Sequence, residues 1–134
     1  MKLETIRDDY CYCCGEKNPQ GLKLIFTYPE PGTAETSCKI PSHFTGWQNL
    51  THGGLLAMLL DETMAHACIS EAGMGVTAEI TVRYRHPIQV GKTVRIAAEV
   101  KTRKSRILET EGWIRDGEGN IVADAKARFL ITSH

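Results

Sequence analysis

One long apolar stretch constrains the fold of this chain more than any other feature. From Gly53 to Ala72 the sequence consists of apolar and small residues, interrupted chiefly by Asp61, Glu62 and His66. This composition predicts an α-helix that is apolar around most of its circumference, and such a helix must be covered on most sides. Two glycines directly after it predict its end. We therefore expect a central, buried helix.

Runs with the pattern of β-strands flank this helix on both sides. Two precede it, at residues 22–28 and 33–40, joined as a hairpin through residues 29–32. Four follow, at residues 76–84, 93–101, 106–115 and 120–131, separated by short hairpin-like connections. In the first of these four, apolar residues from Val76 to Tyr84 alternate with Thr77, Glu79, Thr81 and Arg83, which predicts a half-buried strand. One curved antiparallel sheet wrapped around one helix would satisfy this order of elements.

Length and charge narrow the class of protein. A chain of 134 residues with 42% hydrophobic residues predicts one domain over residues 1–134, of which 1–21 form a leader. Sixteen basic residues balance sixteen acidic ones, which argues against nucleic acid or an anionic membrane as the main partner. The longest uninterrupted apolar run spans only Leu55 to Leu60, and the first residues lack an apolar signal core. We expect a cytoplasmic protein with reduced cysteines.

The start of the helix carries the most informative motif. Thr51-His52-Gly53-Gly54 leads into it, and the unpaired backbone N–H groups of a first helical turn attract negative charge, including the developing oxyanion of a thioester. A tight turn without function is the alternative. Asp61 sharpens the functional interpretation because a carboxylate in an apolar helix is costly to bury unless it is paired. Glu62 is expected on the solvated side.

The spacing of these groups predicts a site built by two subunits. Gly53 and Asp61 are about 12 Å apart along a helix that rises about 1.5 Å per residue, too far to reach the same carbonyl group. Two antiparallel copies related by a twofold axis would bring the helix start of one subunit near Asp61 of the other. We expect an isologous dimer.

The chain combines His52-Gly53-Gly54, Asp61 and this order of elements with the leader Cys11-Tyr-Cys-Cys-Gly15-Glu-Lys-Asn-Pro-Gln-Gly-Leu22. In this combination it resembles the hot-dog-fold thioesterases, in particular the branch with the phenylacetate-pathway enzyme. The resemblance implies an α+β hot-dog fold, with a long central helix wrapped by a curved antiparallel sheet of about six strands. It also implies hydrolysis of an acyl-CoA without a metal or a cofactor, coenzyme A being part of the substrate, by a homodimer or a dimer of dimers.

The resemblance assigns roles to individual residues. Asp61 is the general base or nucleophile, the N–H of Gly53 stabilises the oxyanion, His52 orients the loop, and Thr77 supplies a hydroxyl from the polar face of its strand. Gly46 stands where many members carry an Asn or Gln. The substrate-binding candidates are Gly54, Trp47, Gln48, Asn49, Arg83 and Arg85, and the acyl group is expected beside Leu55, Leu56 and Met58.

Other interpretations remain open at this point. A hot-dog protein that binds acyl-CoA without turnover is one alternative, and a 3-hydroxyacyl thioester dehydratase with a paired His and carboxylate is another. Cys11, Cys13 and Cys14 suggest half of a zinc site, but no second Cys pair or His motif follows, so packing of the leader against the active-site loop is favoured. His43, His66 and His134 show no partner in the sequence.

Overall fold

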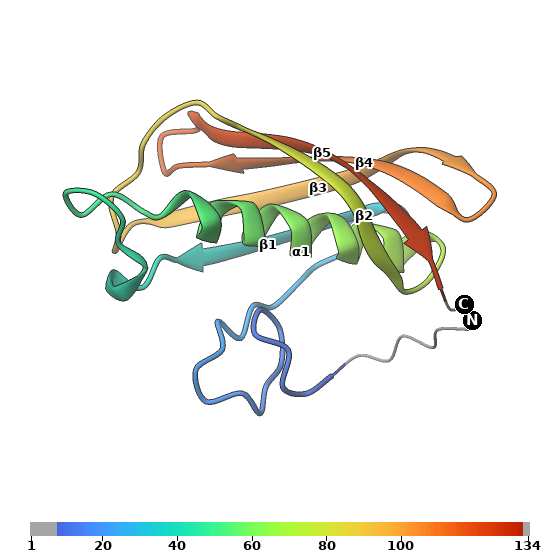
Figure 1. Ribbon diagram of the computed structural model, residues 1–134, viewed down its shortest axis with the longest axis horizontal. Coiled ribbons are helices and arrows are strands. Elements are labelled where there is room, and N and C mark those ends of the chain that lie inside the picture. Colours follow the sequence, from blue (N-terminus) through green and yellow to red (C-terminus); the bar gives the residue numbers. More distant parts are fainter. Residues whose placement is uncertain (1–7, 133–134) are drawn as a thin grey trace.

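The computed structural model describes residues 8–132. Within them one long helix, α1 (Gly53–Glu71), lies in the hollow of a curved antiparallel sheet, and a short 3-10 helix, η1 (Ser42–Phe44), precedes it (Figure 1). The sheet has the strand order β1-β3-β4-β5-β2. Its strands are β1 (Thr33–Lys39), β2 (Gly75–Tyr84), β3 (Thr93–Lys104), β4 (Ile107–Arg115) and β5 (Ile121–Ile131). The expected hot-dog architecture is therefore confirmed.

The sheet has five strands rather than about six, because residues 22–28 do not form the predicted strand. This segment contributes an isolated bridge, in which Thr27 and Glu35 exchange two backbone hydrogen bonds of 2.9 Å. The preceding part of the segment is bonded elsewhere, since the N–H of Leu22 donates to the carbonyl of Tyr12 at 2.8 Å. The first part of this segment is therefore hydrogen-bonded to the leader, and only its later part is hydrogen-bonded to β1.

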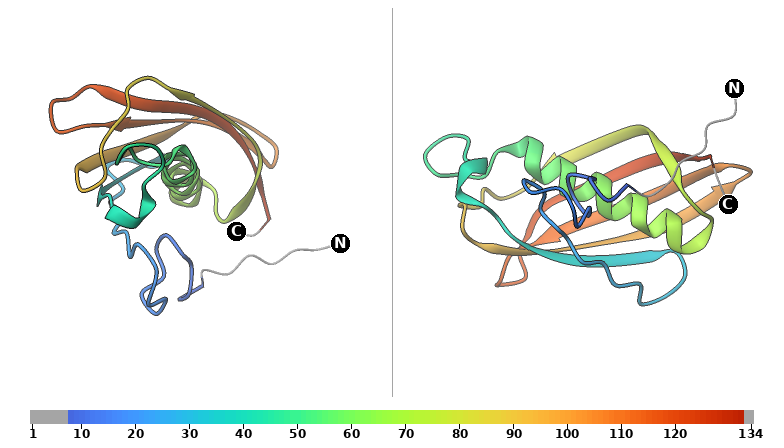
Figure 2. Two further views of the ribbon diagram at one scale, coloured as in Figure 1. Left: turned by 60° about the vertical axis from the view of Figure 1, so that its left-hand side comes forward. Right: turned by 90° about the horizontal axis from the view of Figure 1, so that it is seen from below.

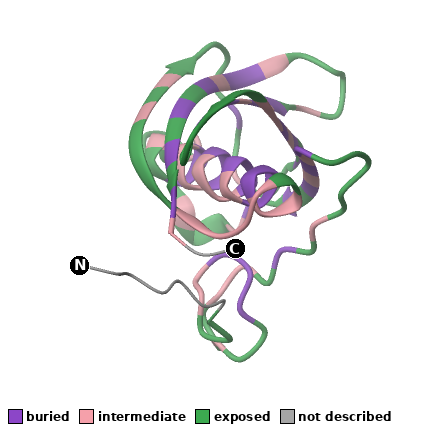
Figure 3. Ribbon diagram, turned by 90° about the vertical axis from the view of Figure 1, so that its right-hand side faces the viewer, coloured by how far each residue is buried: buried purple, intermediate pink, exposed green. Residues whose placement is uncertain are grey.

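The predicted burial of the helix is confirmed. Every residue of α1 from Leu55 to Ser70 is buried or half-buried, and alternate residues of the sheet pack against it (Figure 3). Over residues 8–132, no helix combines the length and the apolar composition needed to cross a membrane. The inward-facing sheet residues include Val94, Ile96, Ala98, Leu108, Ile114, Ala123, Ala125 and Phe129.

The described part of the leader, residues 8–21, covers the face of α1 that points away from the sheet (Figure 2). It contains no regular helix or strand, yet Cys13 and Cys14 are only 4% and 6% exposed. The ring of Tyr12 meets that of Phe44 edge-on at 6.2 Å. The leader therefore packs on α1 and on η1, just before the loop that leads into the helix; residues 1–7 of the predicted leader lie outside the described residues.

Candidate active site

The structure brings Asp61 of α1 and Thr77 of β2 into direct contact. The Thr77 hydroxyl donates a hydrogen bond of 2.6 Å to Oδ1 of Asp61. Burial raises the pKa of the Asp61 carboxyl, the hydrogen bond from Thr77 lowers it in part, and the neighbouring charge of Glu62 adds to the rise. A half-buried carboxylate with a raised pKa, oriented by a hydroxyl, has the properties of a general base or nucleophile.

A β-bulge in β2 makes this contact possible. The pairing of β2 with β5 shifts between Thr77 and Glu79, so that Ala78 is the extra residue. Thr77 lies opposite the buried Phe129, and therefore on the face of the sheet that meets the helix. The prediction that Thr77 belongs to the polar face was wrong, because simple alternation continues through the strand only where no bulge interrupts it.

The same bulge changes the face of another residue. Val76, predicted on the apolar inner face, lies opposite the exposed Leu130 and is itself 40% exposed. Ile80 and Val82, after the bulge, lie opposite Ala127 and Ala125 and pack against the core as expected. The alternation predicted from residue 76 to 84 therefore holds only for the second half of the strand.

The start of α1 is held by its own motif. His52 is the N-cap residue, and its Nδ1 accepts a hydrogen bond of 2.8 Å from the N–H of Gly54. A Cβ atom on Gly54 would lie 3.0 Å from that nitrogen, so a side chain there would push the His52 ring away. On the strand side, the Tyr84 hydroxyl donates to the carbonyl of Gly53 at 2.8 Å, a contact that sequence reasoning missed.

These contacts leave the first N–H group of the helix, that of Gly53, available. The N–H groups of Gly54 and Leu55 are taken by the side chain and the carbonyl of His52, respectively. The N–H of Gly53 has no acceptor within the described part of the chain. It projects from the positive end of the helix dipole, where a developing oxyanion is stabilised.

An open groove of about 430 Å³ lies against this helix start. Gly53, Leu56 and Tyr84 line it, as do the predicted substrate contacts Trp47 and Arg85. Asp61 is not among its lining residues, so within one copy the carboxylate and the helix start remain apart. The groove therefore contains the helix start without the carboxylate.

The remaining substrate-binding candidates lie in different surroundings. Gln48 and Asn49 occupy an exposed turn, where both have a positive φ, of 51° and 63°. Arg83 lies on the outer face of the sheet, opposite Asp124. Arg85 is ion-paired with that same aspartate at 2.8 Å. Sequence patterns did not reveal where these side chains lie, because their places depend on turn geometry and on the register of strand pairing.

The apolar candidates near the helix start differ in their contact with the groove. Leu55 and Leu56 are 3% and 4% exposed and both belong to the hydrophobic core, but of the two only Leu56 also lines the groove; Met58 is half-buried. A further polar atom beside the groove is the hydroxyl oxygen of Thr51, which is buried and has no partner among the described residues. Sequence analysis gave Thr51 no role beyond its place in the motif, since nothing in the pattern reveals an unsatisfied hydroxyl.

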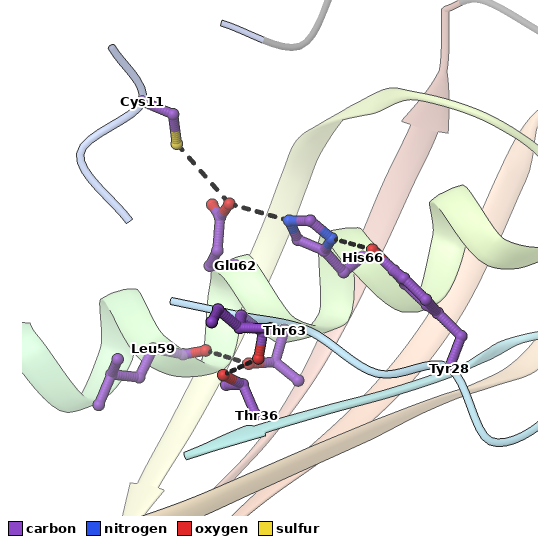
Figure 4. A network of polar contacts seen from close by, with 8 residues as sticks. Cys11, Tyr28, Thr36, Leu59, Glu62, Thr63 and His66 are labelled. Atoms are coloured by element: carbon purple, nitrogen blue, oxygen red, sulfur yellow. Dashed lines mark hydrogen bonds and ion pairs between the residues drawn. The ribbon is translucent and has the colours of Figure 1, made fainter. Parts of the chain in front are cut away.

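Glu62 was expected on a solvated surface, and this prediction was wrong. Its side chain is 21% exposed, contacts Nε2 of His66 at 3.3 Å and accepts a hydrogen bond of 3.7 Å from the Cys11 thiol (Figure 4). Burial alone would raise the pKa of Glu62, but hydrogen bonds from His66, Cys14 and Cys11 outweigh it and hold the pKa below its usual value. The leader is the element that covers Glu62.

His66 likewise has the partners that the sequence could not reveal. Its Nδ1 lies 2.7 Å from the hydroxyl of Tyr28, and its ring stacks on Phe26 with centroids 3.8 Å apart. His43 lies beside the ring of Phe44 at 4.5 Å, and His134 falls outside the described residues. His66 and Glu62 therefore form a closed polar cluster between α1 and the residues before β1.

Comparison with known proteins identifies the family to which the chain belongs. A family model described as the thioesterase superfamily matches residues 48–123. An acyl-coenzyme A thioesterase of Xenopus laevis, THEM4, is 30% identical over 89 residues, which cover 66% of this chain and 40% of the relative. The human acyl-coenzyme A thioesterase 13 is 26% identical over 107 residues, covering 78% of this chain and 76% of the relative. The chain thus spans less than half the length of the THEM4 relative that it matches.

A solved structure supports the fold independently. The PaaI protein of Escherichia coli, from the phenylacetic acid degradation operon, superimposes with a TM-score of 0.78 over 84% of this chain and 81% of that one. The two chains are 20% identical, so the likeness concerns the fold. The resemblance inferred from the His-Gly-Gly motif and Asp61 is confirmed.

Proposed function

The chain belongs to the thioesterase superfamily, and from this premise we propose that it hydrolyses an acyl-CoA thioester to a free carboxylate and CoA. The observation that carries the proposal is the contact between Thr77 and Asp61, at 2.6 Å, on the helix-facing side of a bulged edge strand. Bulges are common next to active sites because they redirect a side chain. Here the redirected hydroxyl orients the carboxylate that the reaction needs.

In the proposed reaction Asp61 acts on water or on the thioester itself. As a general base it accepts a proton while the water oxygen bonds to the carbonyl carbon; the carbon–sulfur bond then breaks and the CoA thiolate takes the proton. As a nucleophile its oxygen bonds to the carbonyl carbon and the carbon–sulfur bond breaks, so that CoA leaves as a thiolate that takes up a proton; water then cleaves the mixed anhydride to the free carboxylate and restores Asp61. Both routes pass through an oxyanion, for which the N–H of Gly53 is the proposed donor.

We propose that two copies of the chain build each site. α1 runs unbroken from Gly53 to Glu71, so Gly53 and Asp61 are separated by about 12 Å of helix. β2 is an end strand of the sheet, and side-by-side antiparallel pairing of two β2 strands would place α1 of each copy alongside the other. The proposal includes this homodimer, its further pairing into a dimer of dimers, and a cytoplasmic location, which suits five free cysteines.

The structure supports the two alternative functions less well than hydrolysis. A dehydratase would need a histidine and a carboxylate facing the substrate, but the Glu62–His66 pair lies under the leader and both nitrogens of His66 are engaged. An acyl-CoA binding protein without turnover would fit the glycine at position 46, whose surroundings are backbone atoms of Leu50 and His52. Binding alone does not require a carboxylate oriented by a hydroxyl, whereas the proposed hydrolysis does, so the Asp61–Thr77 contact favours hydrolysis.

The first experiment measures release of free CoA thiol from aromatic and short- to long-chain acyl-CoAs. Wild type is compared with Asp61→Asn and Asp61→Ala, and Glu71→Gln serves as the matched control because it removes a carboxylate at the exposed end of the same helix. We expect turnover in wild type and control but not in the two Asp61 variants. Tight binding of acyl-CoA without turnover by wild type would instead identify a binding protein.

A second experiment tests the two-copy site by complementation. Gly53→Pro removes the proposed N–H donor at a helix position that tolerates proline, and Gly53→Ala retains it while adding the same Cβ. Each of Asp61→Asn and Gly53→Pro should be inactive alone, whereas mixed dimers regain one intact site. Full activity from a monomer, or no recovery in verified mixed dimers, would refute the shared site.

A further inference from the structure

Three potential metal ligands meet where the leader crosses α1. One Sγ each from Cys11 and Cys14 and one carboxylate oxygen of Glu62 all lie within 4.8 Å of one another. The Cys11 Sγ is 3.7 Å from Oε1 of Glu62, and the Cys14 Sγ lies within 4.8 Å of that sulfur and of a carboxylate oxygen of Glu62. Figure 4 shows the Cys11 thiol pointing at the Glu62 carboxylate. Two sulfur atoms and one oxygen thus converge from distant parts of the chain.

The spacing of these atoms suits zinc. Zinc binds thiolate sulfur at about 2.3 Å and carboxylate oxygen at about 2.0–2.2 Å in tetrahedral geometry, so that neighbouring sulfur and oxygen ligands lie about 3.5 Å apart. The 3.7 Å between Cys11 Sγ and Glu62 Oε1 is close to this value. Soft thiolate ligands favour zinc over the harder cations that prefer oxygen alone.

A tight turn presents the two cysteines together. The N–H of Gly15 donates to the carbonyl of Cys11 at 2.9 Å and closes a turn over residues 11–15. A Cβ atom on Gly15 would collide with the backbone of Asp9 and of Cys11, so only glycine fits here. Cys13, between the two ligands, belongs instead to the hydrophobic core.

The carboxylate is held in place from its other side. His66 lies 3.3 Å from Oε1 of Glu62, and His66 is itself fixed by the Tyr28 hydroxyl at 2.7 Å and by stacking on Phe26. Groups that orient a ligand in this way are a regular part of metal sites. The leader contains no helix or strand over residues 8–21, and the contact with Glu62 adds to the packing of Cys13 and Tyr12 that holds it against the rest of the fold.

We propose that Cys11, Cys14 and Glu62 bind one Zn²⁺ ion that fastens the leader to α1, with water as the fourth ligand. Binding releases the two thiol protons, and two thiolates and one carboxylate then face the doubly charged ion. The sequence gave no sign of Glu62 as a ligand, because it lies far along the chain from the cysteines and on a helix. The site is structural and takes no part in the proposed hydrolysis.

The test is metal binding by the whole, reduced chain. Wild type, Cys11→Ser/Cys14→Ser and Glu62→Gln are purified with a non-thiol reductant, loaded with zinc, desalted and analysed for metal. We expect about one zinc per wild-type chain and a loss of most of it in both variants. Cys13→Ala is the matched control, because it removes a thiol of the same turn that is not a ligand, and it should retain zinc.

Two further readouts keep the proposal falsifiable where a variant folds poorly. Cobalt added to the metal-free wild type should give a thiolate-to-cobalt absorption band that zinc abolishes, and a chelator should lower the melting temperature of zinc-loaded wild type but not of the double variant. Wild type that holds no more zinc than the double variant would overturn the proposal. So would a Cys11–Cys14 disulfide that persists in the reduced preparation. Because no substrate is used, these outcomes are independent of the proposed hydrolysis.

Discussion

Asp61 and Glu62 are neighbours on one helix, yet their environments differ in every respect. Asp61 faces the bulged edge strand and accepts one hydrogen bond, from Thr77, and burial raises its pKa. Glu62 faces the leader and His66, and several hydrogen bonds together outweigh burial and lower its pKa. Burial thus disfavours the ionised form of the first carboxylate, whereas the hydrogen-bond partners of the second favour its ionised form. Two adjacent positions that face different elements thus separate the proposed catalytic carboxylate from one that is held by contacts with the leader and His66.

The largest expected effect is on turnover. Replacing Asp61 with Asn should lower kcat by about 10²–10⁴-fold, because general bases contribute roughly that factor. Glu62→Gln should change kcat by less than about tenfold, since Glu62 lies under the leader away from the groove. Steady-state kinetics of the two variants side by side make the measurement. Equal losses in both would break the distinction between the two carboxylates.

The pH dependence of activity tests whether Thr77 sets the pKa of Asp61. Thr77→Val removes the hydrogen bond that lowers the pKa of Asp61, so this pKa should rise and the acidic limb of the kcat/KM profile should move to higher pH. A lost hydrogen bond to a charged group costs about 1.5–3 kcal/mol, or roughly 10–100-fold in rate at neutral pH. Thr77→Ser, which keeps the hydroxyl, should retain the wild-type profile. An unchanged acidic limb in Thr77→Val would show that Thr77 does not act through Asp61.

How much of this contrast the sequence contains depends on the residue. The helix, the four strands after it and the importance of Asp61 followed from apolar periodicity, from the cost of a buried carboxylate and from the family resemblance. The bulge at Ala78 did not, because one extra residue leaves no mark in a pattern of small and β-branched residues. The surroundings of Glu62 were equally hidden, since a helix apolar all round gives no indication of which side the leader covers.

The next effect is on stability and has opposite signs at the two sites. Glu62→Gln should lower the free energy of unfolding at pH 7 by about 1–3 kcal/mol, because charge-assisted hydrogen bonds are weakened. Asp61→Asn should raise it slightly, because it removes a carboxylate whose ionised form burial disfavours. Urea unfolding of chelator-treated, reduced protein makes the measurement. A stabilised Glu62→Gln would contradict the assignment of Glu62 as a structural group.

The pH dependence of these differences follows from the direction of each shift. The folded pKa of Glu62 lies below its usual 4.5, so its ionised form stabilises the fold above that pH, and the stabilisation is lost as the pH falls through the folded pKa. The folded pKa of Asp61 lies above its usual 3.8, so its ionisation destabilises the fold at neutral pH and protonation relieves this as the pH falls. Both variants should therefore approach wild-type stability in acid, from opposite sides.

The smallest expected effect tests the leader's hold on Glu62 without metal. Cys11→Ala removes the thiol donor at 3.7 Å from Oε1 of Glu62, and in chelator-treated, reduced protein it should cost about 0.5–1 kcal/mol, the contribution of one hydrogen bond. Cys11→Ser keeps a donor and should recover most of this loss. Hydrogen exchange of residues 8–21 provides the local measurement, with faster exchange in Cys11→Ala alone. Equal exchange in all three proteins would mean that packing of buried residues such as Cys13 holds the leader. The polar cluster would then accommodate Glu62 without anchoring the leader.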